Sequence, residues 1–531
     1  QGAIARRAGL LAAGTLLSRI LGAARDAVFA ASFSVGATDA FYMAFTIPNA
    51  LRVLLGEGAV SGAFVPVYTE VREKEGRARA GLFFSRLLGA MLLLLLGVSL
   101  LGVLFAPGLV TLYAGGYRDD PELFADTVTL VRVVFPYIFL MGLAALFTGA
   151  LQAEKRFTAP ALAPATLNVA FIGAALLLTP FALGLGLPAV GALALGALLG
   201  GALQGLVQLP ALRGAGLLQR PRIDFRDPYV RKAFRLLIPL LAGLGVYQLN
   251  VMLARQLASH LPEGSVSYLY YSQRLVELPQ GMFAMAIASA ALPTLSELRA
   301  RGEAEETRRI FRYALRLALF VAIPASVALT LLAEPITAVL FGRGSFGSTQ
   351  IVETARALRV MALGIWAVAA VRTVVPMFHA YNDTRTPVIG SAINLLTFGL
   401  VAAALMQPLG HVGLAAAISA AAAAQLGTLL LLLRHREGPL GLREVLGASL
   451  RILLATAPMA LVLEGITAWG HWRERGGDLQ NVGVFLLAVA AGALTFLLSA
   501  KLLGVREVGE LSEALGARLR RRRERRHADE S

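Results

Sequence analysis

Seven charged side chains lie inside stretches of the sequence that are otherwise apolar. They are Arg19, Arg25, Asp26, Arg52, Arg274, Glu277 and Arg372. A charge at the centre of a bilayer costs roughly 2.5–3.5 kcal/mol on insertion scales, so such residues face a water-filled cavity or pair inside the protein. Arginine keeps its charge and offers a planar fork that fits pairs of phosphate oxygens. The excess of arginine over acid therefore predicts a site for an anion that enters or crosses the membrane.

The first apolar stretch gathers several of these residues on one side of a predicted helix. Ser18, Gly22 and Arg25 follow the spacing i, i+4, i+7, and Arg19, Gly22 and Asp26 follow i, i+3, i+7, so both sets share one broad face. Neighbouring residues on a helix do not face each other. We therefore expect that Arg25 and Asp26 do not form a self-contained pair.

Two further stretches carry polar groups at helical spacing. Asn49 and Arg52 are one turn apart with Glu57 beyond them, and Arg274 and Glu277 are one turn apart in a later stretch. An alternative interpretation is that Arg25–Asp26, Arg52–Glu57 and Arg274–Glu277 are structural ion pairs. Because arginines outnumber acids on these faces, we favour the binding interpretation.

Other basic residues are left out of the predicted site. Arg372 and Arg255 are expected near helix ends, where a long side chain extends to the membrane surface. The Arg-rich segment 518–526 is expected to contact solvent or anionic lipid.

The composition is that of a multi-pass membrane protein. Of the 531 residues, 57% are hydrophobic and 15% are charged, and the mean hydropathy is +0.68. Soluble domains carry about 25% charged residues. Charge-free runs such as 87–105 and 161–212 are long enough to cross a bilayer. We predict an all-α protein with about fourteen transmembrane helices, at 6–33, 37–70, 82–106, 124–152, 159–180, 187–212, 232–259, 267–297, 308–332, 351–380, 387–406, 411–434, 444–468 and 480–504.

The loops between these spans differ in charge. One alternate set holds 23 Lys and Arg residues and the other holds 4. By the positive-inside rule the basic loops and both termini lie in the cytoplasm. An even number of spans agrees with this orientation.

The chain repeats itself at an offset of about 227 residues. Ala63-Phe64-Val65-Pro66 with Glu70 recurs as Ala290-Ala291-Leu292-Pro293 with Glu297, and Thr158-Ala159-Pro160 with Asn168 recurs as Arg385-Thr386-Pro387 with Asn394. Each unit holds six spans. Two parallel repeats are a transporter architecture with the substrate site between the halves.

The predicted domains follow from this repeat. They are a first lobe at 1–212, a cytoplasmic linker at 213–235, a second lobe at 236–436, two extra helices within 437–504 and a basic tail at 505–531.

Several function classes are excluded by the sequence. Cysteine is absent, the six histidines have no metal-ligand spacing, and no Gly-rich phosphate loop of the Walker type occurs. We expect no cofactor, no metal, no catalytic residues and no nucleic-acid partner, and therefore a transporter rather than an enzyme.

The motifs resemble those of the MurJ/MviN family, the lipid II flippases of the multidrug/oligosaccharidyl-lipid/polysaccharide (MOP) exporter superfamily. They are Ser18-Arg19-Ile20-Leu21-Gly22, Ala24-Arg25-Asp26, Ala37-Thr38-Asp39-Ala40-Phe41, Pro48-Asn49 with Arg52, Gly56-Glu57-Gly58-Ala59, and Tyr270-Tyr271 with Arg274, Leu275, Glu277 and Pro279. The resemblance covers essentially all predicted spans and is most specific in the first, second and eighth.

The resemblance implies a substrate, a mechanism and a location. The substrate is lipid II, the undecaprenyl-pyrophosphate-linked peptidoglycan precursor, flipped from the inner to the outer leaflet of the bacterial cytoplasmic membrane by alternating access of two six-helix lobes. The last two helices hold the lipid tail, and the protein works as a monomer among membrane lipids.

The resemblance also assigns roles to residues. Substrate-binding residues are Arg19, Arg25, Asp26, Arg52 and Arg274, and gate or positioning residues are Ser18, Asp39, Asn49, Glu57 and Glu277. Some relatives carry sodium-site acids in the seventh and eleventh spans, but this chain has Ala254 and Phe398 there, which argues against a sodium site. Two alternatives stay open: a flippase for O-antigen-type oligosaccharide lipids, and a multidrug/cation antiporter of the same superfamily.

Overall fold

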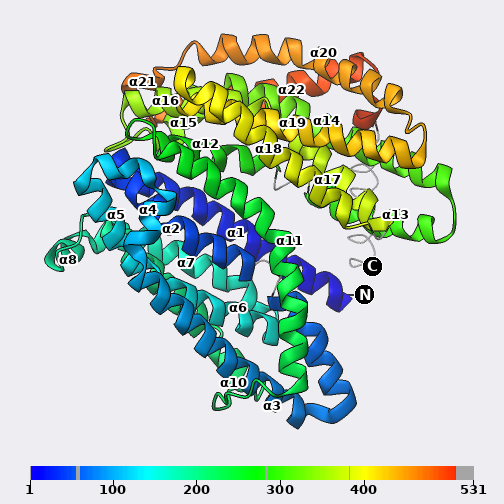
Figure 1. Cartoon of the computed structure of the whole chain (residues 1–531). Coiled ribbons are helices and arrows are strands. Elements are labelled where there is room, and N and C mark those ends of the chain that lie inside the picture. The colour runs from blue at the N-terminus through cyan, green and yellow to red at the C-terminus, as the bar shows by residue number, and fades with distance from the viewer. Residues whose placement is uncertain (1, 56–59, 281–284, 382, 510–531) are drawn as a thin grey trace, which may run out of the picture. The chain divides into compact units, whose positions relative to one another are not determined.

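The computed structural model describes residues 2–55, 60–280, 285–381 and 383–509 (Figure 1). Within these ranges the chain forms α-helices, one short 3₁₀ helix and no β-strand, which confirms the predicted all-α class. Glu57 and the Arg-rich segment 518–526 lie outside the described residues.

The helices form two compact units. The first unit contains the described residues up to Ser267 together with Arg343–Phe346, and the second contains the remaining described residues. The predicted boundaries at 212, 235 and 436 follow from the sequence repeat, and they stay predictions.

The first unit begins with three long helices and continues with shorter ones. Its elements are α1 (Gly2–Ser32), α2 (Val35–Leu54), α3 (Val60–Leu104), α4 (Ala106–Tyr113), η2 (Gly115–Asp119), α5 (Pro121–Val134), α6 (Tyr137–Ala153), α7 (Thr158–Leu177), α8 (Thr179–Gly184), α9 (Gly191–Leu206), α10 (Leu209–Gly214) and α11 (Pro228–Ala258).

The second unit follows a similar order of elements. They are α12 (Ser265–Pro279), α13 (Met285–Ala300), α14 (Ala304–Leu331), α15 (Ala333–Phe341), α16 (Ser348–Ala362), α17 (Ile365–Ala380), α18 (Arg385–Leu409), α19 (His411–Glu437), α20 (Leu442–Thr467), α21 (Trp472–Arg475) and α22 (Leu479–Leu502).

The sequence repeat corresponds to a repeat of structural elements. α4 to α7 and α15 to α18 each begin about 227 residues apart. Two glycines at matching positions also share a left-handed backbone: Gly76 has φ 84° and divides α3 into two arms, and Gly302 has φ 76° between α13 and α14. Glycine adopts this conformation without the steric cost that a Cβ brings. The predicted second span, 37–70, covers most of α2 and the start of α3, and residues 56–59 between them lie outside the described residues.

Several helices start at residues that suit a helix amino end. Ser34, Asp120 and Asp478 each accept a hydrogen bond from a backbone N–H in the first turn of α2, α5 and α22. Such caps satisfy donors that have no partner within the helix. Pro121 and Pro228 stand at first-turn positions, where a missing N–H costs nothing.

Many of the helices have the length and hydropathy of membrane spans. Among the described residues, nine helical segments are apolar enough to cross a bilayer, and the bent pair α16–α17 would make a tenth. α1, α2 and α12, which carry the predicted site residues, are not among the nine. The count of fourteen spans stays a prediction.

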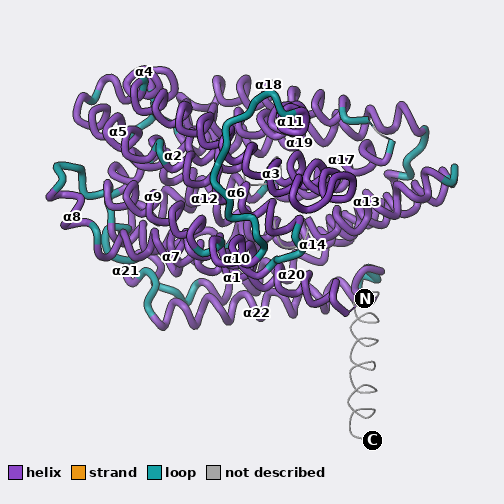
Figure 2. The backbone as a smooth tube through the Cα atoms, turned by 90° about the horizontal axis from the view of Figure 1, so that it is seen from below, coloured by secondary structure: helices purple, strands orange, loops and turns teal. Residues whose placement is uncertain are grey.

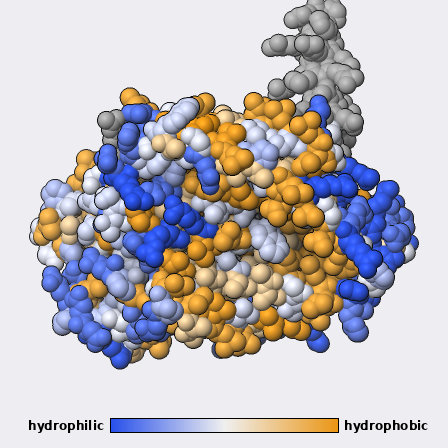
Figure 3. Space-filling model, turned by 90° about the horizontal axis from the view of Figure 1, so that it is seen from above, coloured by the Kyte–Doolittle hydropathy of each residue, from blue (hydrophilic) through white to orange (hydrophobic). Residues whose placement is uncertain are grey.

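The last two long helices expose most of their apolar surface. Only 28% of the residues in the apolar stretch of α20 and 17% of those in α22 are buried. Figure 3 looks onto the side of the second unit where α20 lies, and hydrophobic side chains cover the middle of this face between hydrophilic ends. This distribution matches a helix pair that contacts lipid along its length.

The segment between α10 and α11, residues 215–227, lies across the first unit as a long loop (Figure 2). We call it the linker strap. The backbone N–H of Arg222 donates to the Ser85 carbonyl at 3.0 Å, and the Asp227 carboxylate accepts hydrogen bonds from Arg79 at 2.9 Å and Arg86 at 2.5 Å. Burial raises the pKa of the Asp227 carboxyl, but the hydrogen bonds from Arg86 and Arg79 outweigh it and hold the pKa below its ordinary value. The strap is therefore fixed to α3.

Close packing of α1 against α7 sets the position of the first helix. A Cβ at Gly14 would lie 2.4 Å from the Ala161 carbonyl oxygen, so only glycine permits this approach. Further along the pair, Phe29, Phe41 and Phe171 form a buried cluster with ring centroids 5.5–6.2 Å apart. The polar residues of α1 lie between these two contacts.

Candidate functional site

The centre of the candidate site in the first unit is the pair Arg25–Asp26 on α1. Arg25 Nε and Nη2 donate to Asp26 Oδ1 at 3.0 and 2.7 Å, and the two residues are only 7% and 3% exposed. The two neighbours bond to each other, contrary to the reasoning from their spacing, but the pair is not self-contained, because Arg25 also bonds to Asn168. The rule on neighbouring positions concerns the directions of the Cα–Cβ bonds, whereas the long arginine side chain brings its guanidinium round to the next residue.

Asn168 on α7 connects this pair to Ser18. Its Oδ1 accepts from Arg25 Nη1 at 3.1 Å, and its Nδ2 donates to the Ser18 carbonyl at 3.1 Å and to Ser18 Oγ at 3.3 Å. Ser18, Arg25 and Asp26, predicted to share a face, thus belong to one hydrogen-bonded group, which we call the α1–α7 polar cluster. In the sequence Asn168 stands out only as part of the repeat, so it was not predicted as a site residue.

Aromatic rings enclose the Arg25 guanidinium on the same side. Its central carbon lies 5.5 Å from the centroid of Phe171 and 5.7 Å from that of Phe29. At these distances the rings attract the cation and exclude water from it. Arg25 is therefore held in a defined orientation by an acid, an amide and two rings.

The other predicted arginines of the first unit are more accessible. Arg19 is exposed, next to Ile20, which is 60% exposed. Arg52 on α2 is half-buried, and its Nε donates to Asn49 Oδ1 at 2.9 Å. The structure therefore joins Asn49 to Arg52, as their spacing of one turn indicates, while Glu57 lies outside the described residues.

Asp39 has a role at the amino end of α12. Its two carboxylate oxygens accept hydrogen bonds from the backbone N–H groups of Gly264 and Ser267, both at 2.7 Å, and Thr38 Oγ1 lies 2.7 Å from Ser267 Oγ. Asp39 is only 3% exposed. A carboxylate at this position satisfies amino-end donors and opposes the positive end of the helix dipole. Asp39 thus fixes the last residues of the first unit to α2.

Arg255 was predicted to extend toward the membrane surface, and this prediction was wrong. Its Nη1 donates to Thr46 Oγ1 on α2 at 2.7 Å, and the residue is half-buried. Thr46 is itself only 2% exposed, so the guanidinium points into the unit. The position near a helix end concealed this direction.

In the second unit, the predicted residues Arg274 and Glu277 lie together on α12. Arg274 Nη1 donates to Glu277 Oε2 at 3.1 Å, and Arg274 Nε donates to the Tyr270 hydroxyl at 3.3 Å. The side chains of Arg274 and Glu277 are 40% and 38% exposed. An exposed pair of this kind contributes little to stability, so its polar atoms stay accessible to a ligand. Arg372, left out of the site, donates to the Gln280 carbonyl at 3.4 Å.

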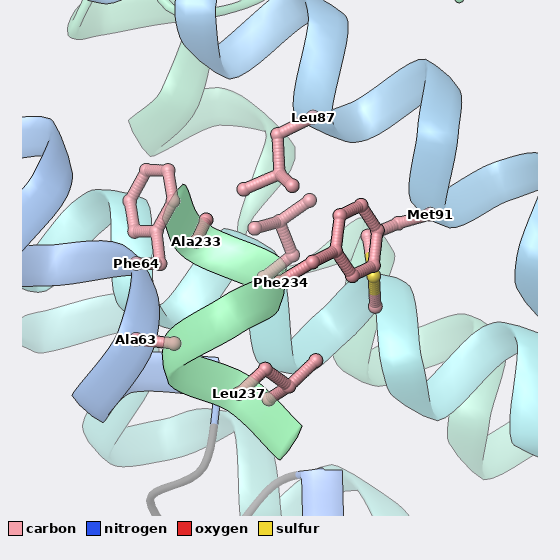
Figure 4. Close-up of a pocket in the computed structure, with 8 residues that line it drawn as sticks. Ala63, Phe64, Leu87, Met91, Ala233, Phe234 and Leu237 are labelled. Carbon is pink, nitrogen blue, oxygen red and sulfur yellow. The ribbon is translucent and has the colours of Figure 1, made fainter. Parts of the chain in front are cut away.

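Two further observations concern metal ions and anions as ligands. Within the described part of the chain, no group of three His, Asp or Glu side chains could hold a metal ion. The first unit contains a small apolar pocket of about 20 Å³ (Figure 4), lined by Ala63, Phe64, Leu87, Met91, Leu146, Ala233, Phe234 and Leu237. Because this lining offers neither charge nor hydrogen-bond donors, the pocket is a packing defect between α3, α6 and α11 rather than an anion site.

Comparison with known proteins gives consistent matches over most of the chain. The sequence model of the family described as "Lipid II flippase MurJ" matches residues 29–473. The lipid II flippase MurJ of Burkholderia cenocepacia is 35% identical over 461 residues, which cover 86% of this chain and 88% of that protein. The probable lipid II flippase MurJ of Vibrio cholerae is 34% identical over 510 residues, covering 94% and 95%.

Solved structures agree with these matches. A structure described as "Lipid II flippase MurJ, inward closed conformation" aligns with a TM-score of 0.77 at 25% identity, over 93% of this chain and 98% of that one. An inward-facing multidrug resistance MATE family transporter of the MOP superfamily aligns with a TM-score of 0.66 at 15% identity, over 80% and 95%, and shares the fold. The resemblance found in the motifs is thereby confirmed, and the chain belongs to the lipid II flippase MurJ family.

Proposed function

We propose that this protein flips lipid II from the inner to the outer leaflet of the cytoplasmic membrane. Relatives that are 34–35% identical over most of the chain are described as lipid II flippases or probable ones. The observation that carries the proposal at the level of chemistry is the buried α1–α7 polar cluster, which orients an arginine inside an apolar helix bundle. Such a residue suits a substrate whose head group is a pyrophosphate.

The arginines divide into two roles. Arg19, Arg52 and Arg274 are exposed or half-buried, so their guanidinium groups meet the pyrophosphate first. Arg25 is held by Asp26 and Asn168, and we propose that a phosphate oxygen replaces the Asn168 amide oxygen on Arg25 Nη1. An exchange of one acceptor for another keeps the guanidinium bonded throughout, which avoids a buried donor without a partner.

The gate residues act on the conformational cycle. Alternating access by two six-helix lobes requires contacts that form in one state and break in the other. Asp39 binds backbone N–H groups at the amino end of the helix that carries Arg274, so its contacts are suited to opening and closing. We assign supporting roles to Ser18, Asn49, Glu57 and Glu277, and we add Arg255 because it connects α11 to α2.

Orientation and lipid contact complete the proposal. The loops rich in Lys and Arg, with both termini, lie in the cytoplasm. α20 and α22, which bury little of their apolar surface, hold the lipid tail. The protein works as a monomer.

Complementation tests the function. The gene should restore growth to a bacterium depleted of its own lipid II flippase, and lipid II should become accessible to an added outer-leaflet probe. Growth without lipid II at the outer leaflet would contradict the proposal and favour the alternative of another oligosaccharide lipid.

Reporter tags test the orientation. The loops at Gly302 and Gly186 have positive φ and open space around the glycine, so both tolerate an insertion. A tag at Gly302 should report cytoplasm and a tag at Gly186 the exterior. The reverse result would overturn the orientation without affecting the substrate assignment.

A further inference from the structure

A second charged site lies in the second unit, away from the residues discussed so far. A pocket of about 360 Å³ opens between α14, the start of α20 and the end of α22, within the size range of small-ligand sites. Arg443, Gly447 and Arg451 line it from one face of α20 at i, i+4, i+8 spacing, and Arg506 lines it from the segment after α22. Unlike the apolar pocket of the first unit, it offers several guanidinium groups.

The floor of the pocket holds one arginine and two acids. Arg316 Nη1 lies 2.7 Å from Glu444 Oε1, and Arg316 Nη2 lies 2.6 Å from Glu507 Oε1. Glu507 is only 1% exposed. One arginine paired with two acids therefore fixes α14 to both flanking elements, and these three groups together carry a formal charge of −1, fewer charges than the three arginines of the rim supply.

The rim keeps its positive charge. Arg443, Arg451 and Arg506 are all exposed, and none of them forms an ion pair within the ranges that the structure describes. The walls leave room between them, because Gly447 and Gly504 have no heavy atom within 4 Å of where a Cβ would stand. The pocket thus presents three accessible guanidinium groups around an open space.

The pocket stands at the edge of the apolar surface of α20 and α22. Leu446 is 71% exposed and Leu450 57%, both beside the arginines of α20, and Leu502 at the end of α22 is 88% exposed. Leucines this exposed on a membrane helix contact acyl chains. A ligand in the pocket would therefore have its polar part among arginines and its apolar part along leucines.

We propose that this pocket binds the phosphodiester head group of an anionic membrane phospholipid, with its acyl chains along α20 and α22. Basic pockets between membrane helices favour such head groups, because a desolvated phosphate gains charge-assisted hydrogen bonds from arginine. The sequence after residue 509 carries seven more arginines and so adds to the attraction of this end of the chain for an anionic surface. The proposal is independent of the flippase function.

Native mass spectrometry of the full chain in detergent tests the proposal. The chain is titrated with phosphatidylglycerol and, separately, with phosphatidylcholine, and a Kd is obtained for each lipid. We expect tighter binding of phosphatidylglycerol. Each basic residue near an anionic head group strengthens binding by about fivefold. The triple variant Arg443→Gln/Arg451→Gln/Arg506→Gln should therefore raise the Kd for phosphatidylglycerol at least about tenfold and leave that for phosphatidylcholine unchanged.

A matched control separates the pocket from diffuse charge. Arg220, Arg385 and Arg434 are also exposed, and their replacement by Gln removes the same charge outside the pocket. This control triple should keep the wild-type preference for phosphatidylglycerol. An equal loss in both triple variants would mean that only net charge attracts the lipid, and the proposal would fail.

A steric variant tests the pocket with its charges intact. Gly447→Leu fills the open space, and Gly465→Leu places the same side chain on the same helix, at another glycine with open surroundings. The first should weaken phosphatidylglycerol binding and the second should not; equal binding by both overturns the proposal.

Two further measurements identify the ligand and the site. Inorganic phosphate should not displace the lipid; displacement would assign the pocket to a free phosphate and overturn the lipid assignment. The double variant Arg25→Gln/Asp26→Asn should bind phosphatidylglycerol like wild type, and a loss there would place the lipid at the candidate flippase site instead.

Discussion

Two variants of the Arg25–Asp26 pair can separate a structural role of Arg25 from a role in transport. One variant removes only the arginine charge, and the other removes both charges. Arg25→Gln leaves the Asp26 carboxylate, which is only 3% exposed, without the two hydrogen bonds that it receives from Arg25. Breaking a buried pair by removing one partner typically costs about 3–5 kcal/mol, because the remaining charge stays buried. We therefore expect a large loss of thermal stability in Arg25→Gln.

The double variant Arg25→Gln/Asp26→Asn removes both charges and keeps side chains of similar size. Replacement of a whole buried pair by neutral groups is often close to neutral in free energy. Its stability, measured by thermal unfolding of the purified protein in detergent, should return to within about 1–2 kcal/mol of wild type, the range of a few net hydrogen bonds. Complementation of a flippase-depleted strain should nevertheless fail, since the guanidinium is absent.

The exposed pair Arg356–Glu353 is a matched control. These residues are 3.0 Å apart with side chains 51% and 26% exposed. Their double neutralisation should change stability by less than about 1 kcal/mol and leave complementation intact. Growth supported by the Arg25→Gln/Asp26→Asn variant would refute the reasoning, because Arg25 would then serve only to neutralise Asp26.

Four further changes have defined outcomes. Asn168→Leu removes the acceptor on Arg25 Nη1 and should lower lipid II exposure at the outer leaflet several-fold while the protein still inserts; unchanged transport would remove Asn168 from the site. Thr38→Cys/Ser267→Cys places sulfur atoms where two oxygens are 2.7 Å apart, so a disulfide should form in this cysteine-free chain and stop transport until reductant is added; transport by the oxidised protein would show that these contacts persist through the cycle. Arg274→Ala should abolish complementation and Arg274→Lys should retain part of it, because a point charge loses the bidentate geometry; equal activity of the two variants would argue against phosphate binding there. Asp227→Asn should destabilise the first unit by about 1–3 kcal/mol at neutral pH, and the difference should vanish as the pH falls through the lowered pKa of Asp227; a difference independent of pH in thermal unfolding would exclude the charge as its cause.

The sequence predicted the fold well because membrane helices have a strong compositional signal. Most predicted spans agree with observed helices to within several residues, as for 387–406 with α18 and 480–504 with α22. The predicted span 351–380 is two helices, α16 and α17, with a bend of 43° between them that hydropathy does not register. The structure thus adds the positions of such bends to the predicted spans.

The candidate site was less predictable, for reasons that differ between residues. Spacing indicates which side chains share a helix face, and it placed Ser18 and Arg25 together. It does not show how far an arginine side chain bends, so spacing argued against the contact Arg25–Asp26 and gave no sign of the contact Arg255–Thr46. Asn168 was missed because its partners are 143 and 150 residues away in the sequence, and a single amide carries no signal of its own.

The linker strap has a consequence for proteolysis. Between α10 and α11 the sequence offers trypsin Arg222 and Arg226, whereas the Arg220–Pro221 bond resists it, and a free connection of this length would be cleaved at once. The strap, however, is bonded along α3, and a protease needs the chain to detach before cleavage. When detachment is fast compared with cleavage, the rate of cutting measures the free energy of local opening rather than of global unfolding. Tryptic cleavage here would therefore report how tightly Asp227 holds the strap to α3, and a ligand that tightens the first unit should protect these two bonds without touching them.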